Sequence, residues 1–159
     1  QCMLAPRVEA RLLQELNLQK NERVLEIGAG SGYMAALLAQ YADQVVTLEI
    51  DPALALLARE NLERAGIRNA SVRVGDGARS GIPDGPFDAI LLSGSVAEVP
   101  SRLLDLLRDG GRLIAIAGQE PVMRVTTVRK QGSRFDVSYP WDTNTARLLN
   151  FAEPSAFRF

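Results

Sequence analysis

The sequence predicts an α/β domain with a doubly wound, mostly parallel sheet of seven strands. As far as residue 118, short apolar runs alternate with stretches that have the apolar spacing of helices, and this alternation is typical of parallel sheets. Beyond it, two β segments follow each other across a short turn, which predicts a C-terminal antiparallel hairpin at the edge of the sheet. A glycine-rich turn follows the first strand, and the predicted binding site is built around it.

The first half of the chain contains three predicted helices and three predicted strands. Val8, Leu12 and Leu16 have helical spacing and define the first helix. Asp51-Pro52 combines an N-cap acid with a proline at the first helical position, and Gly66 ends that helix. Helices are expected at residues 6–16, 32–40 and 52–65, and strands at residues 23–27, 44–50 and 71–75.

The second half begins with a loop at residues 78–86, which is rich in glycine and proline. A fourth strand is expected at residues 87–92, ending at Ser93-Gly94-Ser95. A helix is expected to open at Pro100-Ser101, to show an apolar face at residues 103–107 and to end at Asp109-Gly110-Gly111. The remaining strands are predicted at residues 113–117, 122–130 and 135–139, the last two joined at Gly132.

The composition indicates one globular domain over residues 1–159. Its hydrophobic residues make up 47% and its charged residues 23% of the chain. The net charge of −1 gives no electrostatic footprint for nucleic acid, and the apolar runs are too short to cross a bilayer. Because the only cysteine is Cys2, which we interpret as a packing residue, no disulfide framework is expected and a cytoplasmic location is favoured.

Two absences in the sequence are informative: histidine and a start methionine. The chain has no histidine, which removes the commonest general base and most zinc sites, so no metal site is expected. It also has no start methionine and opens directly into a helical pattern. We therefore expect that a native N-terminal segment precedes Gln1.

The glycine-rich turn carries Gly28, Gly30 and Gly32 at alternate positions. A dinucleotide-binding turn would need its third glycine at Tyr33. Glu26, two residues before the first glycine, would repel a pyrophosphate but attract the ammonium and sulfonium groups of S-adenosylmethionine. The turn therefore favours S-adenosylmethionine as the ligand, and an NAD-dependent oxidoreductase is the least favoured interpretation.

Two further acids follow the next strands. Glu49 lies at the end of the second strand, where a carboxylate can accept both ribose hydroxyls, and Asp76 follows the third strand, where it can receive the adenine amino group. The plain alternative is a tight turn with solvated acids, but acids at consecutive strand ends argue against it. The predicted cofactor-binding residues are Glu26, Gly28, Ala29, Gly30, Gly32, Glu49, Ile50, Asp76 and Gly77.

The segment from Val24 to Tyr33 resembles the first motif of class I S-adenosylmethionine-dependent methyltransferases. Together with Gly75-Asp76-Gly77, the segment from Phe87 to Ile90 and the segment from Gly110 to Ile114, it resembles protein-L-isoaspartate (D-aspartate) O-methyltransferases. The resemblance implies a Rossmann-like methyltransferase fold, S-adenosyl-L-methionine as cofactor, a longer N-terminus, and methyl transfer to a carboxylate of damaged aspartyl residues in a protein or peptide.

Two positions depart from the family. The family carries a serine two residues before Pro6, taken to contact the substrate carboxylate, and this chain has Leu4 there. After the fourth strand the family tends to have Gly-Ala-Ala, and this chain has Ser93-Gly94-Ser95 there. Ser95 is a candidate catalytic hydroxyl, against the alternative of a loop or N-cap serine; otherwise no catalytic residue is assigned. The alternatives are therefore a small-molecule or RNA acceptor, with RNA disfavoured by the charge, or a protein that binds S-adenosylmethionine without catalysis. The oligomeric state stays open.

Overall fold

One seven-stranded sheet forms the centre of the computed structural model, which describes residues 3–79, 82 and 85–154. Cys2 and residues 80–81 and 83–84 of the predicted loop lie outside the described residues. The strands are β1 (Arg23–Ile27), β2 (Gln44–Glu49), β3 (Ala70–Val74), β4 (Phe87–Val96), β5 (Leu107–Gln119), β6 (Val122–Gln131) and β7 (Arg134–Asp142). The helices are α1 (Pro6–Leu16), α2 (Tyr33–Tyr41), α3 (Pro52–Arg64) and α4 (Ser101–Leu104).

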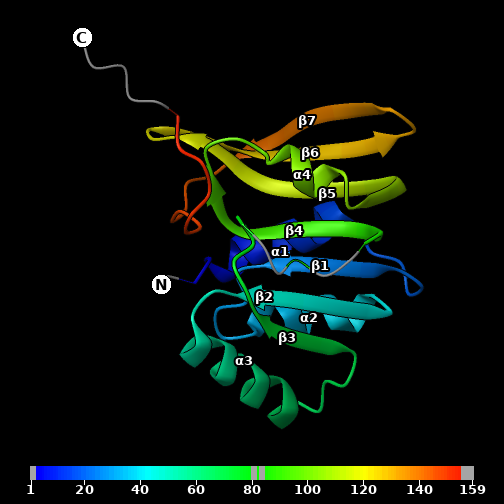
Figure 1. The fold of residues 1–159 in the computed structure, drawn as a ribbon, viewed down its shortest axis with the longest axis vertical. Helices are drawn as coiled ribbons and strands as arrows, with labels where there is room; N and C mark the ends of the chain where they lie inside the picture. The colour runs from blue at the N-terminus through cyan, green and yellow to red at the C-terminus, as the bar shows by residue number, and fades with distance from the viewer. Residues whose placement is uncertain (1–2, 80–81, 83–84, 155–159) are drawn as a thin grey trace.

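The strands lie in the order β3-β2-β1-β4-β5-β6-β7 (Figure 1). The pairs from β3 to β5 are parallel, whereas β6 pairs antiparallel with both β5 and β7. This arrangement confirms the predicted α/β fold, with its mostly parallel sheet and its C-terminal hairpin. Reversal of strand order at β1 places a crevice at the carboxyl ends of β1 and β4, where open α/β sheets bind ligands.

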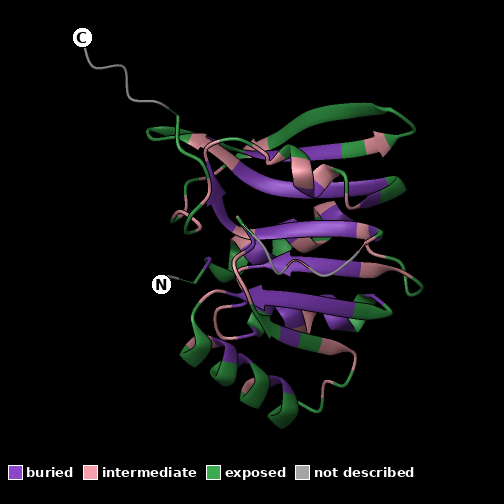
Figure 2. Ribbon diagram, in the orientation of Figure 1, coloured by how far each residue is buried: buried purple, intermediate pink, exposed green. Residues whose placement is uncertain are grey.

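Helices cover the two faces of the sheet unequally. Leu12, Leu38 and Ala58, from the first three helices, share one core with the strands, and Figure 1 shows α1 and α2 behind the sheet. The opposite core contains Leu103 of the short helix α4. Burial is concentrated in the central strands, while β7 is largely exposed (Figure 2). Among the described helices, none is long and apolar enough to span a membrane.

The predicted end of the fourth strand is wrong. β4 runs to Val96, so Ser93-Gly94-Ser95 lies within the strand rather than after it. The cause is pairing with two segments that lie further along the chain. Ser95 and Val96 pair with Ile116 and Ala117 of β5. On the other side, the Ser95 N–H donates to Ala146 O at 2.8 Å, and the Leu148 N–H donates to Ser95 O at 2.9 Å. These contacts extend β4 beyond its apolar run.

The predicted helix after Pro100 is much shorter than expected. α4 ends at Leu104, and the segment Asp109-Gly110-Gly111 lies inside β5 instead of ending a helix. The Phe87 N–H donates to Leu106 O at 2.8 Å, and Phe87 pairs with Leu107. This pairing with β4 draws the second half of the predicted apolar helix face into the sheet.

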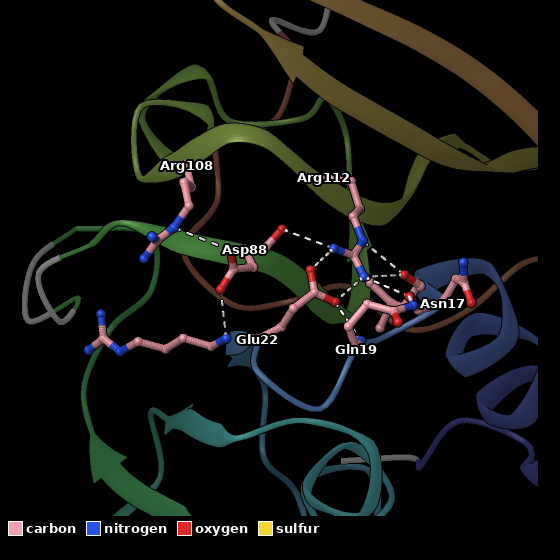
Figure 3. A network of polar contacts seen from close by, with 8 residues as sticks. Asn17, Gln19, Glu22, Asp88, Arg108 and Arg112 are labelled. Carbon is pink, nitrogen blue, oxygen red and sulfur yellow. Dashed lines mark hydrogen bonds and ion pairs between the residues drawn. The ribbon is translucent and has the colours of Figure 1, made fainter.

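A buried network of polar contacts fastens the end of α1 to the sheet (Figure 3). The Arg112 guanidinium, on β5, donates to Leu16 O at 2.8 Å through Nε and to Asn17 O at 3.0 Å. It also forms an ion pair with Glu22, whose side chain is 13% exposed. Burial raises the pKa of Glu22, but the hydrogen bonds from Arg112 and the Gln19 N–H outweigh it and hold this pKa below its ordinary value. The network joins the end of α1 to β5 and to the segment before β1.

Candidate functional site

A cavity of about 270 Å³ lies at the carboxyl ends of β1, β2, β3 and β4. Its size is close to the lower end of the range for ligand pockets, about 300–1,000 Å³. The N-terminal residues Met3 and Leu4 form part of its wall, as do residues 145–149 and Phe151 from the other end of the chain. Segments far apart in the sequence therefore meet at the edge of the sheet that sequence analysis assigns to the ligand.

The glycine turn forms one wall of the cavity. Gly28 and Gly30 line it with φ angles of 99° and 52°, in the left-handed region that favours glycine. Gly32 is not among the lining residues: a Cβ there would lie 3.1 Å from Ala58 O, so this glycine permits close packing of α2 on α3. The remaining predicted residues that line the cavity are Glu26, Ala29, Glu49, Ile50, Asp76 and Gly77.

Glu26 is fully buried in the wall of the cavity. Its carboxylate accepts hydrogen bonds from Thr47 Oγ1 at 2.7 Å and from Ser93 Oγ at 2.6 Å. Burial, with a smaller contribution from the charges of Glu9 and Glu49, raises the pKa of Glu26 to about 7 against the opposing effect of these hydrogen bonds. A cationic ligand group beside this carboxylate would favour its ionised form.

Glu49 and Asp76 are held in place by donors from neighbouring segments. The Glu49 carboxylate accepts from the Gly30 N–H at 2.9 Å and from the Asp51 N–H at 3.1 Å, one on each oxygen. The Asp76 carboxylate accepts from the Ala78 N–H at 2.9 Å and from Asn150 Nδ2 at 2.8 Å. A carboxylate has about four acceptor positions, so Glu49 retains capacity for two ligand hydroxyls.

The two positions that depart from the family differ in their surroundings. Leu4 lines the cavity and is 6% exposed, so an apolar side chain occupies the position of the family serine. Ser95 is fully buried and is not among the lining residues. Its hydroxyl donates to Thr145 O at 2.9 Å and accepts from Arg147 Nη1 at 3.3 Å. These contacts anchor the C-terminal segment to β4, which gives Ser95 a structural role outside the cavity.

Sequence analysis missed Glu9, which lines the cavity from α1. The side chain is 4% exposed, and burial raises the pKa of its carboxyl group. The signal was present, because Glu9, Leu12 and Leu16 lie on one helical face, so an acid occupies a position where an amphipathic helix normally carries an apolar residue. Among the described residues, no group of three or more His, Cys, Asp or Glu side chains is arranged to hold a metal ion.

The sheet order, the glycine turn and the acids around one cavity define the class of protein: a domain with the Rossmann-like methyltransferase fold. The chain belongs to the protein-L-isoaspartate(D-aspartate) O-methyltransferase family, whose family model matches residues 1–142. The resemblance carried by the sequence motifs is thereby confirmed.

Individual relatives agree with this assignment. The protein-L-isoaspartate O-methyltransferase of Methanoculleus marisnigri is 41% identical over 136 residues, which are 86% of this chain and 62% of that protein. The corresponding protein of a Bradyrhizobium species is 43% identical over 137 residues, 86% of this chain and 64% of that protein. A solved structure of a protein-L-isoaspartate O-methyltransferase has a TM-score of 0.81 at 29% identity and covers 90% of this chain and 47% of that one. The chain thus spans about 60% of the length of the curated relatives it matches.

Proposed function

We propose that this chain is the cofactor-binding part of a protein-L-isoaspartate O-methyltransferase that uses S-adenosyl-L-methionine. The observation that carries the proposal is one cavity whose wall contains Glu26, Glu49 and Asp76, each at or after the carboxyl end of a different strand. At its glycines the turn supplies a wall without side chains, so a ligand can approach the main chain where a Cβ would otherwise stand in the way. The residues present therefore fit an adenosyl ligand with a cationic amino-acid part.

Each acid suits a different part of this ligand. The fixed carboxylate of Glu49 is suited to the two ribose hydroxyls, and Asp76 is suited to the adenine side. Glu26 is suited to the cationic amino-acid part, because a positive charge offsets the cost of ionising a buried carboxylate.

The chemistry needs little from the protein beyond positioning. S-adenosylmethionine, when bound, supplies an electrophilic methyl group. An isoaspartyl carboxylate is ionised at pH 7 and needs no general base, in agreement with a chain without histidine. Leu4 and Leu148 make part of the cavity wall apolar, and an apolar wall disfavours water beside the reacting groups.

The acceptor we propose is an isoaspartyl-containing protein or peptide, in a repair reaction of the cytoplasm. A specific observation favours a second candidate: Leu4 has no hydrogen-bond donor, and Ser95 is bonded elsewhere and lies outside the cavity wall. A small-molecule acceptor with its own anchoring group needs neither hydroxyl. Binding of S-adenosylmethionine without catalysis also agrees with this observation.

The deciding experiment is labelled-methyl transfer by the full-length protein. The expected result is methyl incorporation into an isoaspartyl peptide and none into the same peptide with a normal aspartyl residue. Calorimetry with S-adenosylhomocysteine is run in parallel. Normal binding without transfer to the isoaspartyl peptide would favour the second candidate or a protein without catalysis, whereas absence of binding would contradict the cofactor itself.

A further inference from the structure

Among the described residues, Glu9 is the one carboxylate of the cavity wall with a buried oxygen that lacks a partner. Its Oε2 is buried and has no hydrogen-bond partner within the part of the chain that the structure describes, although the residue lines the cavity. An unpaired buried carboxylate is costly, and native proteins keep such groups rarely. An orphaned acceptor in the wall of a cavity indicates a donor that arrives with the ligand.

The other acids of the cavity differ from Glu9 in this respect. Both Glu26 oxygens accept from hydroxyl groups, and both Glu49 oxygens accept from main-chain N–H groups. Among the described lining residues Arg147 is the one cationic side chain, and its guanidinium pairs with Glu153 at 2.8 Å. The group that satisfies Glu9 is therefore external to the cavity wall.

The position of Glu9 defines the chemistry of that external group. Glu9 lies near enough to Glu26 for its charge to raise the pKa of that residue, so two buried carboxyl groups face one region of the cavity. A positive ligand group with N–H donors would supply both a donor for the orphaned Glu9 oxygen and a charge that favours the ionised form of the two carboxyl groups. The sulfonium of the proposed methyl donor has no hydrogen to donate, whereas its α-ammonium has three.

We propose that Glu9 binds the α-ammonium of the methyl donor as a second carboxylate beside Glu26. The inference rests on the proposed function, because it specifies how the same cavity holds the amino-acid part of the cofactor. In this role Glu9 is a binding residue supplied by α1, the element that the Arg112 network fastens to the sheet. Ligand binding would thus account for an acid on the buried face of α1, where packing alone favours an apolar residue.

Two ligands and one substitution test the proposal by calorimetry. S-adenosylhomocysteine carries the α-ammonium, whereas 5′-methylthioadenosine has the same adenosyl thioether without the amino-acid part. Glu9→Gln should weaken S-adenosylhomocysteine binding roughly tenfold or more, as expected for a hydrogen bond between charged groups. The affinity for 5′-methylthioadenosine should stay within about twofold of the wild-type value, because that ligand does not reach Glu9.

Glu15→Gln on the same helix is the matched control, since Glu15 does not line the cavity, and it should leave both affinities unchanged. If Glu9→Gln does not fold, Glu9→Leu carries the same comparison with a side chain suited to the apolar neighbours of α1. Equal losses for both ligands, or no loss for S-adenosylhomocysteine, would overturn the assignment. Failure of the wild-type protein to bind S-adenosylhomocysteine would instead overturn the proposed function.

Discussion

At the scale of single residues, the buried acids of the cavity fall into two kinds, those whose pKa is raised and one that is held by main-chain donors. Glu26 and Glu9 both lie in surroundings that raise their pKa values, so ionising their carboxyl groups costs free energy. Glu49 is held by two main-chain N–H groups. The first two acids are suited to recognising charge, and the third is suited to fixing geometry.

Glu49→Ala is expected to weaken S-adenosylhomocysteine binding by about 1.5–3 kcal/mol, because in the proposed binding mode two ribose hydroxyls lose a charged acceptor. Calorimetry measures the affinity, and 5′-methylthioadenosine should lose a similar amount, since it contains the same ribose. Glu60→Ala, an exposed acid on α3, serves as control. Wild-type affinity in Glu49→Ala would show that the ribose lies elsewhere.

Glu26 makes the stability of the protein depend on pH. Its pKa is about 7 in the folded protein and 4.5 ordinarily, so the folded state holds a proton that the unfolded state has lost between these values. The free energy of unfolding should therefore fall as pH rises from 4.5 to 7, by about 3 kcal/mol at 1.36 kcal/mol for each pH unit. The raised pKa of Glu9 also makes the free energy of unfolding fall as pH rises. The lowered pKa of Glu22 has the opposite sign: it makes the free energy of unfolding fall as pH drops below 4.5.

Urea unfolding at pH 5 and pH 8 measures this dependence. Glu26→Gln removes the titrating group and should reduce the difference in unfolding free energy between the two pH values. Glu60→Gln should keep the wild-type difference, because its carboxylate is exposed. The same difference in all three proteins would contradict the assignment of the proton to Glu26.

At the scale of elements, the C-terminal segment closes the cavity by packing on glycine. A Cβ on Gly94 would lie 2.7 Å from Leu148 Cδ2, and one on Gly28 would lie 3.0 Å from the same atom. The segment is held by the hydrogen bonds that join Ser95 to residues 145–148. Leu148 therefore occupies space that only glycines on β4 and the glycine turn leave open.

Gly94→Ala should displace Leu148 and destabilise the protein by about 1–3 kcal/mol, the usual cost of overpacking. Adding Leu148→Ala to this variant should cost less than Leu148→Ala costs in the wild-type protein, because the two changes act on one contact. Denaturant unfolding of the four proteins gives the coupling energy. Strict additivity would show that Leu148 does not pack against Gly94.

The elements also show what sequence can and cannot predict. The helix at residues 6–16 and the strand at residues 23–27 are observed with those bounds, because helical spacing and a short apolar run are local signals. The extension of β4 to Val96 depends on pairing with β5 and with a segment near residues 145–147, so it has no local signal. The acids at strand ends were predictable from topology, whereas Glu9 reaches the cavity through the packing of a whole helix.

At the scale of the whole molecule, two polar clusters lie at opposite ends of the parallel strands. The cavity gathers the carboxyl ends of four strands, whereas the Arg112 network joins the end of α1 to the segments before β1 and at the start of β4 (Figure 3). In that network the Arg23 N–H donates to Asp88 Oδ2 at 2.8 Å. One helix thus connects the network at its end to Glu9 near its beginning.

Arg112→Met should therefore destabilise the molecule as a whole by about 3–5 kcal/mol, because it leaves Glu22 and two helix-terminal carbonyl groups without their buried donor. Arg108→Met is the matched control from the same network. The Arg108 side chain is 55% exposed and pairs with Asp88 at 3.2 Å, so its loss should cost less than about 1 kcal/mol. Urea unfolding measures both values, and adding Glu22→Leu to Arg112→Met should recover part of the loss. Similar small losses for the two arginines would show that the attachment of α1 rests on its apolar contacts alone.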